Sequence, residues 1–214
     1  MSTAPVRDRR RDRHRQTLDE VVRHALAVMA ESGAAGLSLG EVARRMHMRT
    51  PSLYVYFPSK AALYNEVFAR GWQGFGEAMQ EYDGPLPEGT TLHEHLAAAM
   101  SRALHWASAH PAYSQLMFWR PVPQWEPAPE SYAAAVALRA LTDRVFEGLL
   151  TDGHLRPGTD PAEAAEVWTV MVSGLVSQRL SNEPDVPVGS GRLTALVDPL
   201  VSCFVDRYGS RPTP

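Results

Sequence analysis

With 214 residues, 44% of them hydrophobic and 21% charged, the chain has the composition of a globular protein with a sizeable core, and it contains no apolar run of the roughly 18 residues that a membrane-spanning helix needs. Its net charge of −3 is uneven, because residues 1–60 hold eleven basic against six acidic side chains and the remainder holds ten against eighteen. A basic first quarter favours a polyanion-binding module, and the alternative is a solvated basic tail. No apolar signal-peptide core follows residues 1–15, so we expect a cytoplasmic protein.

Apolar residues recur at helical spacing along almost the whole chain, without strand alternation or a fixed repeat, which predicts an all-α fold of about nine helices. We expect residues 1–14 to form a basic flexible arm that could follow the phosphate backbone or enter a minor groove. The first helix is predicted over about 15–31, and Ser32-Gly33 ends it because glycine readily adopts the left-handed conformation of a C-cap.

The next two helices have clear start signals. Ser38 and Glu41 have the spacing of a capping box, which predicts a second helix that ends near His47. Thr50 is expected to cap a third helix with Pro51 at its first position, where the missing amide donor costs nothing.

Only residues 47–49 separate these two helices, and a turn of this length is typical of a helix-turn-helix, whose second helix enters the major groove of DNA. The third helix, which Pro58 ends, would turn Leu53 and Phe57 inward. Short polar side chains, tyrosines and arginine suit base edges, thymine methyls and phosphates. On the outward face these are Arg49, Thr50, Ser52 and Tyr54, with Val55 beside them and Tyr56 at the boundary. A capped helical pair is also common in proteins that do not bind DNA, so the pattern alone leaves both alternatives open.

A fourth helix is predicted over 60–82, with Ser59 as its cap and Lys60 in its first turn. A cation there opposes the helix dipole, and a nearby DNA phosphate would turn that cost of roughly 0.3–1 kcal/mol into a favourable contact. The proline- and glycine-rich stretch 83–87 ends this helix. Beyond it, helices are predicted over 90–109, 111–119, 129–152, 160–181 and 191–208, separated by loops at 121–127, 153–158 and 183–191.

The run from Leu37 to Leu63, and above all its ending Leu53-Tyr-Val-Tyr-Phe-Pro-Ser-Lys60, resembles the DNA-binding domain of TetR-family regulators, and the likeness covers residues 15–70. The family usually has glycine at the position of His47; histidine tolerates the left-handed conformation better than most residues, so we expect the turn to keep its shape. We therefore divide the chain into a helix-turn-helix domain (15–59), a connecting helix (60–82) and a sensing and dimerisation domain (83–214). The resemblance implies DNA contacts by Ser38, Arg49, Thr50, Pro51, Ser52, Tyr54, Tyr56 and Lys60.

The last two predicted helices, over 160–181 and 191–208, carry broad apolar surfaces and small residues such as Gly174, which favour the interface of a homodimer. A helix-turn-helix monomer makes too few contacts for specific binding, so two-fold dimers on paired half-sites are usual. The resemblance implies a four-helix bundle built from this pair in each subunit; the alternative is that both helices belong to the core of a monomer. Cys203, the only cysteine, lies in the apolar pattern of the last helix and is predicted to be an inert core thiol.

Aromatic and methionine side chains gather in the central helices. Such side chains line adaptable apolar pockets, but they also fill cores, and the residues alone leave this choice open. Because the resemblance implies an inducer in the C-terminal domain, we expect a small apolar or aromatic ligand bound by Trp106, Tyr113, Met117, Trp119, Trp168 and Met171, with Phe118 in the same cluster.

No motif in the chain points to catalysis, a metal or a cofactor. His93 and His95 are two residues apart, so on a helix they point about 200° from each other and cannot share an ion. The alternatives are a small all-α enzyme, which would be active without DNA, and a helix-turn-helix that no longer binds DNA, against which the cations Arg44, Arg45, Arg49 and Lys60 argue. The sequence thus predicts a ligand-responsive regulator, of which the family implies a repressor that an inducer releases from a palindromic operator.

Overall fold

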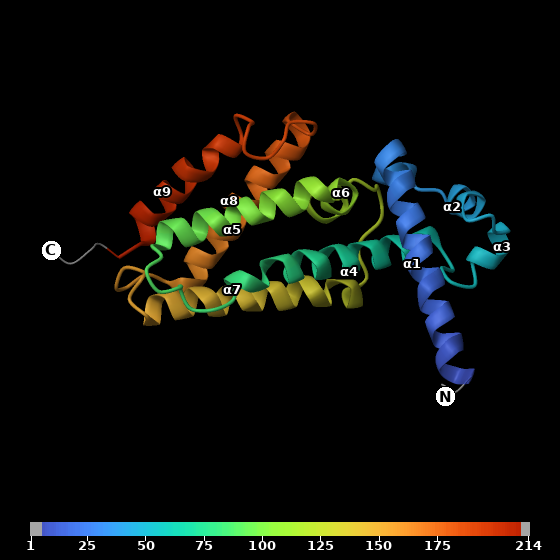
Figure 1. Cartoon of the computed structure of the whole chain (residues 1–214), viewed down its shortest axis with the longest axis horizontal. Coiled ribbons are helices and arrows are strands. Elements are labelled where there is room, and N and C mark those ends of the chain that lie inside the picture. Colours follow the sequence, from blue (N-terminus) through green and yellow to red (C-terminus); the bar gives the residue numbers. More distant parts are fainter. Residues whose placement is uncertain (1–5, 211–214) are drawn as a thin grey trace.

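Nine α-helices make up the part of the chain that the computed structural model describes, residues 6–210. No strand occurs in this range, so the predicted all-α class is confirmed. The first three helices form a small unit at one end of the molecule, and α5, α7, α8 and α9 lie toward the other end (Figure 1). None of the described helices has the length and hydropathy needed to cross a membrane.

The helix-turn-helix unit consists of α1 (Val6–Ser32), α2 (Leu39–Arg45) and α3 (Thr50–Leu53). Helix α1 begins nine residues earlier than predicted, so residues 6–14, which we expected to be a flexible arm, are helical. The physical reason is composition: arginine, which occurs five times in residues 6–14, is a strong helix former, and no glycine or proline interrupts the stretch. The rest of the expected arm, residues 1–5, lies outside the described residues.

The predicted caps of this unit are formed only in part. The Ser38 side chain accepts a hydrogen bond from the Glu41 amide at 3.4 Å, but the Glu41 carboxylate accepts from Arg44 and Arg45 instead of reaching back to Ser38. A charged guanidinium is a stronger donor than a neutral amide, which explains why half of the capping box is missing. Thr50 is the first residue of α3 and not its cap, and α3 ends at Leu53, before the predicted limit at Pro58.

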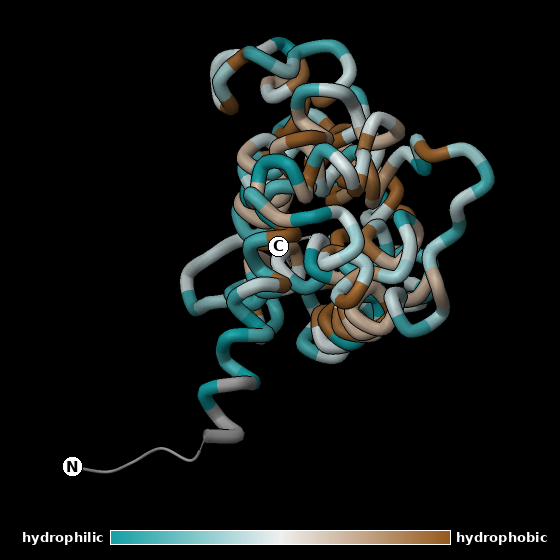
Figure 2. Tube along the Cα trace, turned by 90° about the vertical axis from the view of Figure 1, so that its right-hand side faces the viewer, coloured by the Kyte–Doolittle hydropathy of each residue, from teal (hydrophilic) through white to brown (hydrophobic). Residues whose placement is uncertain are grey.

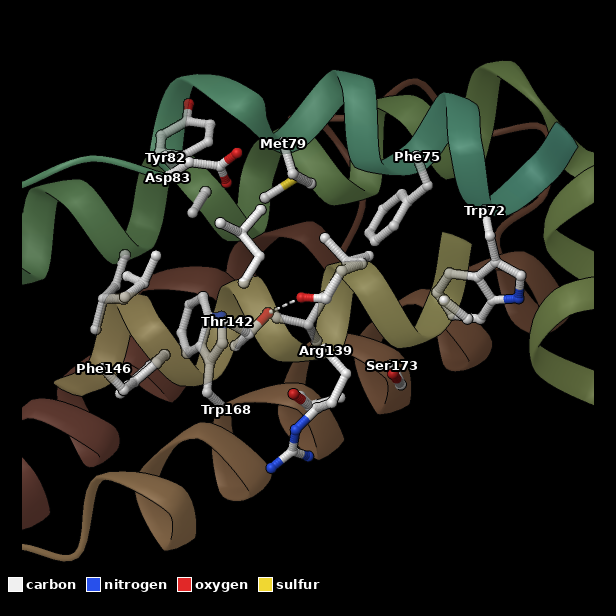
Figure 3. Close-up of a pocket in the computed structure, with 18 of the residues that line it drawn as sticks. Trp72, Phe75, Met79, Tyr82, Asp83, Arg139, Thr142, Phe146, Trp168 and Ser173 are labelled. Atoms are coloured by element: carbon white, nitrogen blue, oxygen red, sulfur yellow. Dashed lines mark hydrogen bonds between the residues drawn. The ribbon is translucent and has the colours of Figure 1, made fainter. Parts of the chain in front are cut away.

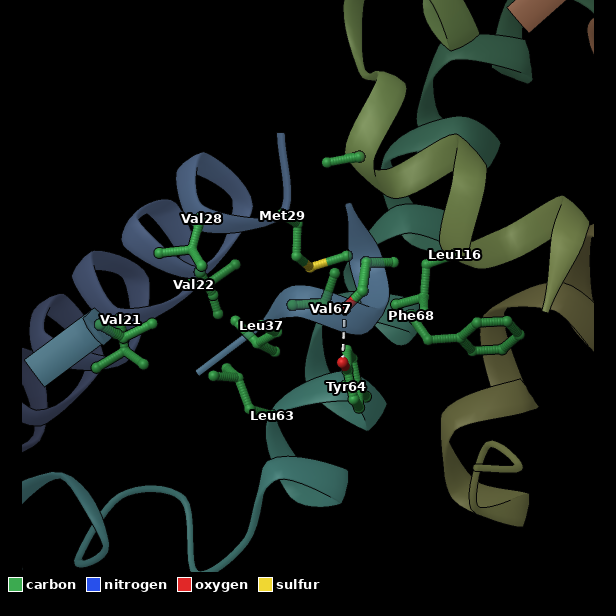
Figure 4. Packing of buried hydrophobic residues seen from close by; sticks show 14 of the residues in the cluster. Val21, Val22, Val28, Met29, Leu37, Leu63, Tyr64, Val67, Phe68 and Leu116 are labelled. Atoms are coloured by element: carbon green, nitrogen blue, oxygen red, sulfur yellow. Dashed lines mark hydrogen bonds between the residues drawn. The ribbon is translucent and has the colours of Figure 1, made fainter. Parts of the chain in front are cut away.

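The core of the unit joins α1 to α4 and α6 (Figure 4). Tyr64 of α4 is fully buried there, and its hydroxyl donates a hydrogen bond of 2.6 Å to the carbonyl oxygen of Ala34. Burial raises the pKa of Tyr64 to about 12, so the phenol keeps the proton that it donates at any ordinary pH. This bond fixes the connection between α1 and α2 on the start of α4.

Replacing Tyr64 by phenylalanine should lower the free energy of unfolding by about 0.5–1.5 kcal/mol, because the buried Ala34 carbonyl would lose its short bond and keep only the one that it accepts from the Leu37 amide at 3.3 Å. Urea denaturation at one protein concentration measures this change. The matched control is Tyr54→Phe, which removes a hydroxyl from a half-exposed ring and should leave stability unchanged. Equal midpoints for the wild type and Tyr64→Phe would show that the hydrogen bond contributes nothing.

The six remaining helices are α4 (Lys60–Met79), α5 (Leu92–Ala109), α6 (Pro111–Trp119), α7 (Ala133–Thr151), α8 (Pro161–Asn182) and α9 (Val197–Tyr208). Each lies where the sequence predicts a helix. Helices α7 and α9 begin later than expected because the short 3₁₀ segments Pro129–Tyr132 and Thr194–Leu196 precede them. Helix α4 packs against α5, α6 and α7, and it runs from the helix-turn-helix unit deep into the C-terminal part (Figure 1).

Two hydrophobic clusters hold the molecule together. The first joins α1–α4 and α6, and the second joins α5, α7, α8 and α9. Trp106 and Phe118 pack against both clusters, so the two cores form one continuous apolar body. A change in the second cluster can therefore reach the first through packed side chains.

Candidate DNA interface and ligand cavity

The turn between α2 and α3 has the geometry of a helix-turn-helix. His47 adopts a left-handed backbone conformation with φ of 53°, as the sequence predicts for the position where the resemblance implies glycine. Leu53 and Phe57 are buried, which fixes α3 on the unit and turns its other face outward. Arg49, Pro51, Ser52 and Tyr54 are exposed on that face, Thr50 and Tyr56 are half-buried, and Val55 is exposed beside them.

The other two predicted DNA contacts flank this face. Ser38 is exposed at the start of α2, although its hydroxyl already accepts from the helix. The Lys60 ammonium donates to the carbonyl oxygen of Ala35 at 2.9 Å and lies 5.4 Å from the centroid of the Tyr64 ring. An ammonium has three donors, so Lys60 can hold the chain in place and still offer a proton to a phosphate.

The N-terminal part of α1 extends the same surface. Its Arg9, Arg11, Arg13 and Arg15 side chains are exposed, and Figure 2 shows this strongly hydrophilic segment projecting from the body. The ring of His14 stacks on Tyr56, with centroids 5.1 Å apart and an angle of 25° between the planes. The stack ties the basic extension of α1 to the turn that follows α3.

Ion pairs neutralise part of the charge near the turn. Arg45 donates to both Glu31 and Glu41, at 2.5–2.8 Å, and Arg44 also binds Glu41. Hydrogen bonds from Arg44 and Arg45 lower the pKa of Glu41 to about 2, so their contribution to stability is present above pH 4.5 and is lost as the pH falls toward 2. Arg49, by contrast, forms no ion pair with any residue that the structure describes, and its guanidinium is available to a phosphate or a base.

A cavity of about 180 Å³ lies between α4, α5, α7 and α8 (Figure 3). Helix α4 contributes a row of side chains with Trp72 at one end and Met79 toward the other, where Tyr82 and Asp83 follow the helix. The walls are mostly apolar. Their larger side chains are Trp72, Phe75, Met79, Leu96, Phe118, Leu138, Leu141, Phe146 and Trp168.

Polar groups in the cavity wall are few. Thr142 donates its hydroxyl proton to the carbonyl of Leu138, and Thr169 donates to that of Ala165. Burial raises the pKa of Asp83, which lines the cavity beside Tyr82. Burial and the nearby His154 lower the pKa of His95, so this imidazole is neutral at pH 7.

Of the six residues predicted to bind a ligand, only Trp168 lines this cavity, together with Phe118 of the same aromatic cluster. Trp106 does not line the cavity: its ring stacks on that of His110 and packs edge-to-face against Phe75, which does line it. The other four predicted residues lie in the packing around the cavity: Tyr113 and Met117 approach Gly71 of α4, the Trp119 indole donates to Ser177, and Met171 packs half-buried against the second cluster.

The contributions of α4 and α7 to the cavity were not predicted from the sequence. Trp72, Phe75, Met79 and Tyr82 recur at steps of three and four residues, so they lie on one face of the helix. That stripe was visible in the sequence, but we had assigned this helix to the connection between domains. Phe146, on α7, had no distinguishing signal.

The two histidines considered as metal ligands point to different neighbours. His93 lies 3.2 Å from Ser202 and Asp198 of α9, whereas the His95 ring faces Tyr82 at the cavity. Among the described residues, no group of three or more histidine, cysteine or acidic side chains could hold a metal ion.

Helices α8 and α9 leave apolar side chains uncovered. Val170 of α8 is 61% exposed, Leu196 just before α9 is exposed, and the space beside Gly174 is empty.

Cys203 of α9 is also exposed, so the prediction of a core thiol is wrong. The reason is helical phase: Val201 and Phe204 occupy the buried face of α9, and Cys203 falls on the opposite side.

Two family models match the chain. The model of bacterial regulatory proteins of the tetR family matches residues 21–67, and the model described as tetracyclin repressor-like, C-terminal domain, matches residues 96–202. The first covers the helix-turn-helix unit and the start of α4. The second alone covers half of the chain.

Relatives with known names or structures agree with this match. An HTH-type transcriptional regulator of Mycobacterium tuberculosis is 28% identical over 158 residues, which cover 72% of this chain and 66% of the relative, just under two thirds of its length. A protein from Rhodococcus has the same fold with a TM-score of 0.73 at 18% identity, covering 90% of this chain and 95% of its own. The regulator FadR from Bacillus subtilis, solved in complex with stearoyl-CoA, gives a TM-score of 0.65 at 17% identity, covering 87% and 96%.

Proposed function

Because this chain belongs to the TetR family of bacterial regulatory proteins, we propose that it is a DNA-binding transcriptional regulator whose affinity for DNA depends on a small molecule in the cavity. Its relatives are regulators and not enzymes. In this proposal residues 15–59 bind DNA, 60–82 connect, and 83–214 bind the ligand and dimerise. The protein acts as a repressor on a palindromic operator.

One observation carries the coupling between ligand and DNA: helix α4 belongs to both sites. Lys60 and Tyr64 at its start hold the helix-turn-helix unit, while Phe75 and Met79 near its end line the cavity. A helix of 20 residues is about 30 Å long and moves as a rigid element. A ligand that favours a different position of α4 would therefore change the separation of the two helix-turn-helix units in a dimer.

Selection of binding sequences from random duplexes tests the DNA-binding proposal. The selected duplex should contain two inverted half-sites about one helical turn apart or a multiple of it, and affinity should fall steeply as salt increases. Failure to enrich any sequence above the random pool, at a salt concentration where non-specific binding is weak, would contradict the proposal.

The dimer is proposed to form through α8 and α9, because Val170 is exposed one turn before Gly174, the surface beside Gly174 is open, and Leu196 is exposed just before α9. Val170→Glu should convert the dimer to a monomer at micromolar concentration, since an unpaired charge buried in an apolar interface costs several kcal/mol. Light scattering coupled to size-exclusion chromatography measures the mass.

The matched control is Val136→Glu on α7, a valine that is 63% exposed on another helix and should leave the dimer intact. A Val170→Glu protein that remains dimeric would place the interface elsewhere.

A further inference from the structure

Most polar groups at the cavity already have partners. The hydroxyl protons of Thr142 and Thr169 are donated within their own helices. Arg139 donates to Asp143 and Glu166, and Figure 3 shows its guanidinium turned away from the enclosed space. The cavity therefore offers no free cation among the described residues.

Asp83 is the charged group in the cavity wall that has no such partner among the described residues. It lies half-buried just after the 3₁₀ segment Gln80–Tyr82, and Figure 3 shows its carboxylate on the side of the cavity, near Met79. No residue that the structure describes donates a hydrogen bond to this carboxylate or forms a salt bridge with it. Burial raises the pKa of Asp83, and the charge of Arg144, which forms no salt bridge with it, lowers this pKa by less. An ionised carboxylate in partly apolar surroundings is stabilised most by a cation that comes within hydrogen-bond distance.

The surroundings of Asp83 suit an organic cation. Phe75, Tyr82 and Trp168 present aromatic rings to the same cavity, and aromatic faces attract ammonium groups. Met79 and Phe146 add apolar surface for a hydrocarbon chain. A carboxylate ligand would instead meet the charge of Asp83 without a compensating cation.

We propose that the cavity selects amphipathic amines, with the protonated amine held by Asp83 and the hydrocarbon held by Phe75, Met79 and Trp168. This inference rests on the proposed function, in which the cavity is the ligand site. It adds the chemical class of the ligand and the residue that selects it.

Three ligands of equal chain length test it by isothermal titration calorimetry on the full-length protein: octylamine, 1-octanol and octanoate. Octylamine should bind at least about tenfold more tightly than 1-octanol, since a charge-assisted hydrogen bond contributes more than one factor of ten in affinity. Octanoate should bind more weakly than either. The variant Asp83→Asn should abolish the preference for octylamine while keeping the affinity for 1-octanol.

The control Asp152→Asn removes an exposed carboxylate outside the cavity and should keep the wild-type preference. Ala135→Trp, which fills the cavity from α7, should remove the heat of binding of all three ligands and so excludes non-specific adsorption. If 1-octanol or octanoate binds as tightly as octylamine, or if Asp83→Asn keeps the preference, the inference about Asp83 is wrong and the ligand site stands. If none of the three ligands binds, the cavity is not a ligand site, and both proposals about it fail.

Discussion

A protein with alanine at both Arg49 and Tyr54 should bind the selected operator at least about a hundredfold more weakly than the wild type. Each side chain that contacts a base contributes about 1–3 kcal/mol, and 1.4 kcal/mol corresponds to a factor of ten. Both residues occur in each subunit, so the proposed dimer would lose four contacts. The double variant should fold normally, because Arg49 has no ion pair among the described residues and Tyr54 is 48% exposed.

The salt dependence of binding separates the two roles. Arg49→Ala alone should reduce the slope of log affinity against log salt by about one for each phosphate contact that is lost. Tyr54→Ala should lower affinity with little change in slope, since the tyrosine carries no charge. Fluorescence anisotropy with labelled duplex measures both quantities.

The matched control is Arg144→Ala, which removes the same charge from the exposed surface of α7, on the side of Asp83 and so at the end of α4 opposite to the helix-turn-helix unit. If the double variant binds like the wild type, or if Arg144→Ala weakens binding equally, DNA is not read by α3.

Lys60 is a poorer choice for this test than the sequence suggests. Its bond to the Ala35 carbonyl means that its replacement would also disturb the fold.

Replacing Phe204 by alanine should lower the free energy of unfolding by about 3–5 kcal/mol, the usual cost of removing a buried aromatic ring. Phe204 is 2% exposed, and its ring packs on those of Phe146, Trp168 and Tyr208, with centroids 4.9–5.8 Å apart. Since Phe146 and Trp168 line the cavity, the variant should also weaken octylamine binding under conditions where it remains folded.

Urea denaturation at one fixed protein concentration measures this loss, because the stability of a dimer depends on concentration. The control is Glu147→Ala: it removes an exposed side chain next to Phe146 on α7 and should change stability little. A loss of less than about 1 kcal/mol in Phe204→Ala would mean that the second cluster closes around the gap.

Much of the fold was predictable because its signals are local. The left-handed turn at His47, the Ser59 cap, and the positions of α4 to α9 depend on residues within a few positions of one another. The errors arose where a local signal had a competitor. Glu41 was expected to complete a capping box, but it binds two arginines, one of which also binds Glu31 of α1.

The sequence by itself determined the all-α class, the order of the helices and the residues that α3 presents on its outer face. Periodicity and turn chemistry fix these features before any long-range contact forms. Only the tertiary structure decided which aromatic side chains enclose a cavity, that α4 contributes a wall of it, and that Asp83 faces it with no partner among residues 6–210. The same holds for Cys203, whose exposure depends on how α9 is rotated against α5. A side chain shows in the sequence that it is apolar, but the packing of helices distant in the chain decides whether it faces a core, a cavity or solvent.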